Sequence, residues 1–253
     1  MTLLESPVAR HFSKYGELDR EQLELIAGAA FKSTKTVGAR RDIILEGARP
    51  GTVKIVLEGW AARYKELPDG HRQLLSIMIP GDICDANAFI IERMDHSLGS
   101  LTEVTYGEIS RTDFETLLTS SPEMTRALWW SELVNASIQR EWTANIGQRQ
   151  AGARIAHLFC EMHVRLSGIG QCRENSIEFP LTQADIGEAT GLTPVHVNRT
   201  LQNLRKNGLI ELRDRRLTIP DPAELRRLAQ FDPAYLHTDV QKDEAIAAFY
   251  GPE

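Results

Sequence analysis

A short run in the last quarter of the sequence carries side chains suited to the edges of nucleic-acid bases. Four positions within residues 193–206 recur three or four residues apart, so a helix would present them on one face. These are Val195, Arg199, Gln202 and Lys206, flanked by His196, Asn198 and Asn203, and the opposite, apolar face is Val197, Leu201 and Leu204. An arginine can donate two hydrogen bonds to guanine, and an asparagine or glutamine can pair with adenine. The pattern predicts a helix that reads DNA bases.

The neighbouring residues predict how this helix begins and what precedes it. Thr193 can cap its first turn, and Pro194 fits there because the first helical residue needs no N–H donor. Gly191 can end a preceding helix in the left-handed conformation. Thr182 and Asp185 predict a capping box at the start of that preceding helix, with Asp in place of Glu or Gln. Two helices joined by so tight a turn form a helix-turn-helix.

A basic hairpin is expected to follow the second helix. The run LIELRDRRLTI, residues 209–219, is typical of two short strands with Arg213, Arg215 and Arg216 at the tip. Because the whole chain has a formal net charge of -6, this local excess of arginine indicates a phosphate-binding surface. The residues expected to contact double-stranded DNA are Thr182, Gln183, Thr193, Val195, His196, Asn198, Arg199, Gln202, Arg213, Arg215 and Arg216.

The first part of the sequence predicts a β-rich domain. Between residues 31 and 110, short apolar runs alternate with glycine corners, and four of them read as strands: residues 52–59, 60–67, 72–79 and 105–110. Regularly spaced strands favour a β-barrel or jelly roll, and Asp19 is expected to cap a short helix before it. The predicted fold class is therefore α+β, with this sensor domain over residues 1–120.

A long helix is expected to connect the two parts. An apolar stripe recurs every four residues within residues 121–150: Trp130, Val134, Ile138, Trp142 and Ile146, with Leu133 beside it. A stripe with this repeat winds around the helix, and its two tryptophans favour contact with a second subunit over burial within one chain. We therefore expect a homodimer built on residues 121–150, a winged helix-turn-helix over residues 151–230 and a tail over residues 231–253.

Composition argues against several other classes of protein. No apolar run approaches the about 20 residues that a membrane span requires, and the N-terminus lacks the pattern of a secretory signal. The three cysteines form no CxxC pair, which favours the cytoplasm; Cys160 is expected to pack in a helix and Cys172 to be exposed in a loop. Cys84 and His96 could serve as nucleophile and base, but no motif places them together, so we expect no enzyme.

The sequence resembles the Crp/Fnr superfamily of bacterial transcription regulators over nearly its whole length. The matching motifs are PGDICDANAF at residues 80–89, the long helix after SSPEM at residues 120–124, and residues 181–219 with the helix-turn-helix and hairpin. The resemblance implies a cyclic-nucleotide-binding-like domain, a dimerisation helix and a winged helix-turn-helix. It also implies that a dimer binds a palindromic promoter site and contacts RNA polymerase.

The resemblance places the effector pocket in a short segment, at Gly81, Asp82, Cys84, Ala86, His96 and Ser97. Well-known members bind ribose through a glutamate where this chain has Ala86, and the cyclic phosphate through an arginine where it has His96. Without the arginine a phosphate loses its bidentate partner, so we expect no response to cyclic AMP. Three cysteines also cannot supply the four thiolates of an iron–sulfur cluster. These residues do not identify the effector.

The recognition helix departs from the same members in one place. They commonly carry a glutamate one turn before the recognition arginine; this chain has Val195 there and retains the arginine as Arg199. A valine can contact a thymine methyl group, so the DNA sequence is expected to differ from the familiar half-sites.

Two alternatives remain open. A haem or redox sensor of the same architecture could use His71, His96 or Cys84 as ligands. A signalling module could instead engage a protein through its C-terminal domain, although the arginines of the hairpin argue against this second alternative.

Overall fold

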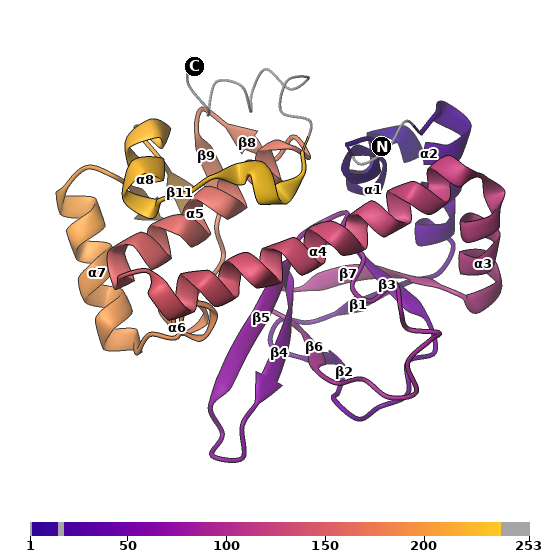
Figure 1. Cartoon of the computed structure of the whole chain (residues 1–253), viewed down its shortest axis with the longest axis horizontal. Coiled ribbons are helices and arrows are strands. Elements are labelled where there is room, and N and C mark those ends of the chain that lie inside the picture. Colours follow the sequence, from indigo (N-terminus) through magenta and orange to yellow (C-terminus); the bar gives the residue numbers. More distant parts are fainter. Residues whose placement is uncertain (1, 15–17, 239–253) are drawn as a thin grey trace. The chain divides into compact units, whose positions relative to one another are not determined.

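Two antiparallel β-sheets form the framework of the N-terminal part of the chain (Figure 1). The structure is a computed structural model that describes residues 2–14 and 18–238. The strands are β1 (Thr34–Val37), β2 (Asp42–Ile44), β3 (Val53–Glu58), β4 (Ala61–Glu66), β5 (Arg72–Met78), β6 (Ser97–Ser100) and β7 (Val104–Ile109). One sheet has the order β1-β7-β3 and the other the order β2-β6-β4-β5. The four strands expected from the sequence are β3, β4, β5 and β7, and they are confirmed.

The strands of both sheets contribute to an apolar core. Its buried residues include Val56, Met78, Leu98, Val104 and Tyr106. Because the strands divide into sheets of three and four, the jelly-roll alternative describes the domain better than a closed barrel. The strands β1, β2 and β6 were not predicted individually, since runs of three or four residues carry too little of the alternating pattern.

Helices cover the three-stranded sheet. They are α1 (Pro7–Phe12), α2 (Arg20–Phe31), α3 (Arg111–Ser120) and the first turns of α4 (Pro122–Gln148), and η1 (Leu3–Glu5) packs against α1 and α2. Asp19 caps α2 as expected, by accepting a hydrogen bond from the N–H of Gln22. Gly107 of β7 lets α2 approach closely, because a Cβ atom there would lie 2.0 Å from the carbonyl oxygen of Ala30.

The helix α4 is continuous over its 27 residues, in agreement with the expected long helix. Three residues of the predicted dimerisation stripe, Val134, Ile138 and Trp142, are at most 5% exposed and are covered by their own chain. Trp130 and Leu133 are 39% and 44% exposed. Trp129, which is not part of the predicted stripe, is 71% exposed. A four-residue repeat drifts around a helix with 3.6 residues per turn, so the stripe passes from the free face of α4 to its packed face. The large apolar side chains exposed on α4 are therefore Trp129, Trp130 and Leu133.

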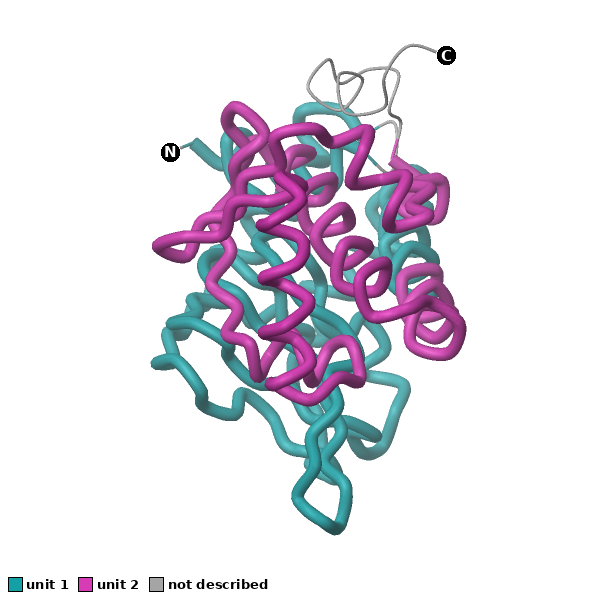
Figure 2. Tube along the Cα trace, turned by 90° about the vertical axis from the view of Figure 1, so that its left-hand side faces the viewer, with its two compact units in different colours: residues 1–136 teal, residues 137–253 magenta. Residues whose placement is uncertain are grey.

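The chain divides into two compact units, residues 1–136 and 137–253 (Figure 2). The second unit contains α5 (Ala151–Ser167), β8 (Cys172–Arg173), β9 (Ser176–Glu178), α6 (Gln183–Thr190), α7 (Pro194–Lys206), β10 (Glu211–Arg213), β11 (Arg216–Thr218), α8 (Pro222–Ala229) and η2 (Pro233–Leu236). Its strands form one antiparallel sheet, β10-β11-β9-β8. The predicted helix-turn-helix and hairpin are α6, α7 and β10–β11, whereas the hairpin β8–β9 was not predicted.

Of the predicted tail, residues 231–238 belong to the described part of the chain, and residues 239–253 lie outside it. Among the described residues, no helix combines the length and the apolar character needed to cross a membrane.

Candidate nucleic-acid interface

The turn between α6 and α7 depends on two glycines with different tasks. Gly191 ends α6 in the left-handed conformation, with φ of 65°, and its N–H donates to the carbonyl of Gly187. Gly187 faces the returning chain: a Cβ atom there would lie 2.5 Å from the carbonyl oxygen of Leu192. The sequence identified Gly191 from its position, but the need for a glycine at position 187 comes from the close approach of the turn, at Leu192, to α6.

Both helices begin with the caps that the sequence predicted. The side chain of Thr182 accepts the N–H of Asp185 at 3.2 Å, and the Asp185 carboxylate accepts the N–H of Thr182 at 2.7 Å. At the start of α7, the side chain of Thr193 accepts the N–H of His196 at 3.3 Å, and Pro194 occupies the first turn. These caps fix where each helix starts and therefore which of its residues point outward.

The outer face of α7 is free of contacts with the helices behind it. Val197, Leu201 and Leu204 are buried, as expected, while Val195 is 81% exposed. Arg199 and Gln202 are exposed on the same side as Val195. Asn198 donates a hydrogen bond to Oε1 of Gln183 at 3.2 Å, which joins the flank of α7 to the first turn of α6. The structure thus brings together the predicted contact residues of the two helices.

The hairpin β10–β11 presents the remaining predicted residues. Arg213, Arg215 and Arg216 are all exposed, and the two residues of the turn, Asp214 and Arg215, have φ of 48° and 58°. Such a two-residue turn matches the twist of a β-hairpin. Arg205 of α7 donates to the carbonyl of Leu212 at 2.9 Å, so this arginine anchors the hairpin to the helix. Arg205 therefore has a structural role, and the exposed positive charge of the hairpin comes from the other three arginines.

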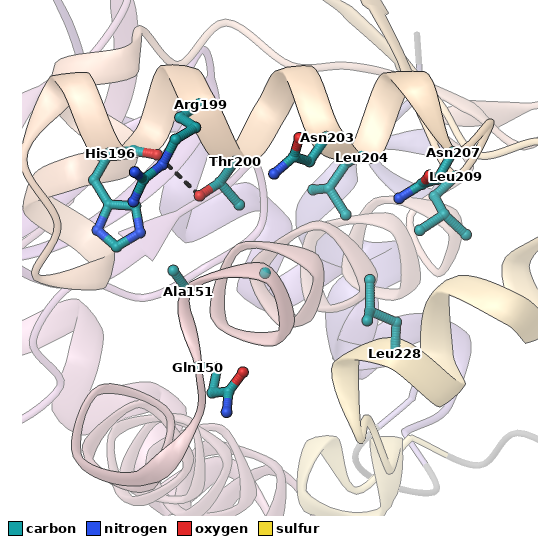
Figure 3. A pocket seen from close by; sticks show the side chains of 11 residues that line it. Gln150, Ala151, His196, Arg199, Thr200, Asn203, Leu204, Asn207, Leu209 and Leu228 are labelled. Carbon is teal, nitrogen blue, oxygen red and sulfur yellow. Dashed lines mark hydrogen bonds between the residues drawn. The ribbon is translucent and has the colours of Figure 1, made fainter.

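A groove of about 630 Å³ runs along one flank of α7 (Figure 3). Its walls are α7, the first turn of α5 and α8, through Gln150, Ala151, Gly152, His196, Arg199, Thr200, Asn203, Leu204, Asn207, Leu209 and Leu228. Gln150 caps α5 without a side-chain hydrogen bond, so the first N–H groups of α5 are available at this flank. The sequence missed Gln150, Ala151, Gly152 and Asn207. The spacing of His196, Asn203 and Asn207 along one side of the helix was the signal that could have indicated this polar flank.

The residues of the predicted effector pocket do not form one cluster. Gly81 has φ of 100° and approaches α1, since a Cβ atom there would lie 2.7 Å from Cβ of His11. The buried carboxylate of Asp82 accepts the N–H of Ile79 at 2.8 Å and lies 3.4 Å from Nδ1 of His11. Ser97 accepts the N–H of Glu46 at 2.9 Å. These three residues hold local structure together.

Ala86 and His96 instead border a charged cluster that the sequence did not identify. Its centre is Arg63 on β4, which is buried and donates from Nε to the carbonyl of Cys84 at 2.9 Å. One oxygen of Asp85 lies 3.3 Å from Nε of Arg63 and 3.3 Å from Nε2 of His96. Arg63 stands within a strand whose other inward residues are apolar, and a charge at such a position was the available signal.

Carboxylates surround this cluster. Asp95 lies 2.6 Å from Nδ1 of His96. Burial lowers the pKa of His96, but Asp85 and Asp95 outweigh it and leave this pKa above its usual value. Glu132 of α4 accepts the N–H of Ala86, and burial raises the pKa of Glu132 although Arg63 opposes that shift. These residues suit a cyclic phosphate poorly, because Asp85, 3.3 Å from Nε of Arg63, already neutralises the guanidinium that would bind it.

The candidate ligands of a haem or metal lie in different surroundings. His71 is exposed at the turn after β4, where its Nδ1 lies 3.1 Å from Asp69. Cys84 is buried, and burial raises the pKa of its thiol. Among residues 2–14 and 18–238, no group of three His, Cys, Asp or Glu side chains is arranged to hold a metal ion. Cys160 is buried as expected. Cys172, expected to be exposed in a loop, instead lies half-buried on β8, because it packs with its Sγ 3.4 Å from Nε2 of His163.

Comparison with known proteins identifies two domains. The model of the Crp-like helix-turn-helix domain matches residues 153–228, and that of the cyclic nucleotide-binding domain matches residues 34–121. A nitrogen fixation regulation protein FixK of Bradyrhizobium diazoefficiens is 27% identical over 199 residues, which cover 79% of this chain and 80% of that protein. The transcriptional activator protein FnrL of Cereibacter sphaeroides is 24% identical over 83% of this chain and 84% of its own length.

Solved structures share the fold. The structure of FixK2 from Bradyrhizobium japonicum is similar with a TM-score of 0.70 and 22% identity, over 79% of this chain and 96% of that one. A CRP-family transcriptional regulator from Thermus thermophilus, TTHB099, is similar with a TM-score of 0.63 and 21% identity, over 78% and 97%. At these identities the similarity establishes the fold alone.

The close approach at Gly187 gives a test of the helix-turn-helix geometry. Gly187→Ala should lower the free energy of unfolding by about 1–3 kcal/mol, because the added methyl group collides with the backbone of the turn. Gly191→Asn is the control, since asparagine tolerates the left-handed conformation and only ordinary contacts surround its Cβ atom. Calorimetric unfolding of both variants makes the measurement, and an equal loss in both would contradict the special role of Gly187.

Proposed function

This chain belongs to the Crp/Fnr family of transcription regulators, and on that premise we propose that it binds a palindromic promoter site as a homodimer. The members of this family are DNA-binding transcription regulators and not enzymes, and this chain is one of them. The observation that carries the proposal is the exposed outer face of α7, with Arg199 one turn beyond Val195. In a helix-turn-helix, the second helix enters the major groove with its N-terminal residues against the bases.

Base reading is assigned to the outer face of α7. Arg199 can donate two hydrogen bonds to guanine, Gln202 can pair with adenine, and Val195 can contact a thymine methyl group. Asn198 and Gln183 hold each other at 3.2 Å, so they enter the interface as a preoriented pair. His196, Thr182 and Thr193 lie beside this face at the starts of the two helices.

Phosphate contacts are assigned to the two flanks. Arg213, Arg215 and Arg216 extend from the hairpin on exposed positions, where flexible cations can follow the DNA backbone. On the other flank, the groove beside α7 combines the polar side chains of Asn203 and Asn207 with the N-terminus of α5. Helix N-termini attract phosphates through their free N–H groups and their dipole, so this groove suits one strand of the duplex.

Dimerisation is assigned to the exposed face of α4. Arg126, Trp129, Leu133 and Ala136 are exposed and follow one another at steps of three, four and three residues. This spacing is the heptad pattern of a left-handed coiled coil, in which two identical helices pack along one seam. A two-fold dimer would place two copies of α7 on two half-sites of a palindrome. We further propose RNA polymerase as a partner at the promoter and the cytoplasm as the place of action.

The sensor domain is proposed to work without cyclic AMP. Asp85 already neutralises Arg63, and the carboxylate of Asp95, whose pKa is lowered by its hydrogen bond to His96, adds negative charge nearby. At the positions where better-known members bind ribose and the cyclic phosphate through a glutamate and an arginine, this chain has Ala86 and His96. The signal that controls the regulator is therefore of another kind.

DNA reading is tested by two arginine variants that should fail differently. Arg199→Ala should weaken specific binding by about 1–3 kcal/mol per half-site and flatten the preference at one base pair, because it removes a base contact. Arg215→Ala should weaken all sequences alike and reduce the salt dependence by roughly one counterion per subunit. Binding-site selection followed by salt titration measures both effects. If Arg199→Ala preserves the selected motif while Arg215→Ala changes it, the recognition helix has been assigned wrongly.

A charged residue at the centre of the exposed apolar face of α4 tests whether this face forms the dimer contact. Leu133→Glu should convert the dimer to monomers at micromolar concentration, because two carboxylates would face each other across the seam. Leu67→Glu is the matched control, since Leu67 is an exposed leucine in the turn after β4. Analytical ultracentrifugation makes the comparison, and an intact Leu133→Glu dimer would exclude α4 as the main interface.

Cyclic AMP should leave DNA affinity unchanged. Calorimetric titration is expected to detect no binding at micromolar ligand, because the carboxylates near Arg63 repel a cyclic phosphate. Micromolar affinity, or a large gain in DNA binding on addition of cyclic AMP, would refute this assignment.

A further inference from the structure

A segment after α8 ties several elements of the second unit together. It comprises residues 230–237, which we call the C-terminal strap, and includes η2. The strap contacts the C-terminal half of α4 as well as α5, while α5 packs against α6 and α7. Its contacts therefore bear on how α4 is held relative to the recognition helix.

The central contact is a carboxylate with no solvent access. Glu161 of α5 is 0% exposed. It accepts hydrogen bonds from Nε1 of Trp142 at 2.9 Å, from the hydroxyl of Tyr235 at 2.8 Å and from Nη1 of Arg165 at 3.2 Å. The donors come from α4, the strap and α5. A buried carboxylate is tolerated only while such donors stay in place, so Glu161 holds three segments in one arrangement.

Aromatic packing adds a second contact. The fully buried ring of His157 stacks on Tyr235, with centroids 5.9 Å apart, and meets the ring of Phe231 edge-on at 5.0 Å. Nε2 of His157 also lies 3.2 Å from a carboxylate oxygen of Glu141 on α4. The strap thus closes over a side chain of α5 that itself reaches α4.

The two ends of the strap are attached to α4 and the residue that follows it. At one end, Arg149 donates to the carbonyl of Gln230 at 3.2 Å and pairs with Glu141 at 2.7 Å. At the other end, the ring of His237 lies 3.3 Å from the hydroxyl of Ser137. The strap therefore spans α4 from Ser137 to Arg149 on the side that faces α5.

This bracing matters because the direct connection is short. Only residues 149 and 150 separate the end of α4 from the start of α5. A junction of two residues can change direction through a few backbone torsions unless other contacts restrain it. The strap supplies restraints that are distant in sequence from the junction.

We propose that the C-terminal strap is a positioning element that sets the half-site spacing of the DNA target, with Trp142, Glu161 and Tyr235 as its specificity-determining residues. The proposal rests on the proposed function, in which α4 carries the dimer seam and α7 reads DNA. Fixing α4 relative to α5, on which α7 packs, fixes the separation of the two recognition helices in a dimer. One added base pair moves a half-site by about 3.4 Å and rotates it by about 35°, so a rigid dimer rejects it.

The test measures affinity of the full chain for palindromes whose half-sites are one base pair closer, correctly spaced or one base pair farther apart. The wild type should lose about tenfold in affinity on either change. Tyr235→Phe, which keeps the ring and removes one donor to Glu161, should reduce that loss to within about threefold. Phe231→Ala with Tyr235→Ala should reduce it further. Ala234→Gln, at an exposed position of the strap, is the control and should behave as the wild type.

Base-pair discrimination separates this role from simple destabilisation of the protein. Discrimination against a substituted base pair within a half-site should be unchanged in Tyr235→Phe, because α7 keeps its own caps and core. A folded Tyr235→Phe dimer that retains the full spacing penalty would overturn the proposal. A wild type that fails to bind any palindrome would instead overturn the proposed function, and the strap's role with it.

Discussion

The buried carboxylate of Glu161 constrains the assembly of the DNA-binding unit more than any other single group. A charge without solvent access must be met by donors, and here two of the three come from other segments, α4 and the strap, while Arg165 lies one turn along α5. Burial and the nearby carboxylate raise the pKa of Tyr235, so its hydroxyl keeps the proton that it donates. Any rearrangement that separates α4 from α5 would leave this carboxylate short of donors. The arrangement of the helices behind α7 is therefore restrained by electrostatics as well as by apolar packing.

The N-terminal unit also contains a buried charge that must be paired, but there the buried charge is positive. The buried guanidinium of Arg63 is met by backbone carbonyls and by Asp85, which also approaches His96. Because Glu132 of α4 and the N–H of Ala86 join this cluster, the charge links strands, a loop and the helix within the first unit. In this part of the chain, which matches the cyclic nucleotide-binding domain, the buried guanidinium is therefore already paired with a carboxylate of the same chain.

The residues proposed to contact DNA fall into two groups, those on helices with fixed orientation and those on flexible side chains. The caps of Thr182 and Thr193 and the contact between Gly187 and Leu192 fix the helix-turn-helix, so the outer face of α7 is presented in one orientation. The arginines of the hairpin stay exposed on flexible side chains, apart from Arg216, which also reaches Ser176. Fixed groups suit bases, whose hydrogen-bonding edges are directional, and flexible cations suit phosphates, which bind at many angles.

The sequence by itself determined the local features of this protein, because caps, turns and helical spacing act over a few residues. Thr182, Gly191, Thr193 and the exposed face of α7 were predicted correctly for that reason, as were four strands of the sheets. Tertiary structure decided which side of α4 is free, since burial of Trp142 depends on α5 and the strap, which lie far along the chain. It also decided the partners of Arg63 and Glu161 and the groove beside α7. Those features arise from contacts between segments that are distant in sequence, so the spacing of residues within one segment cannot predict them.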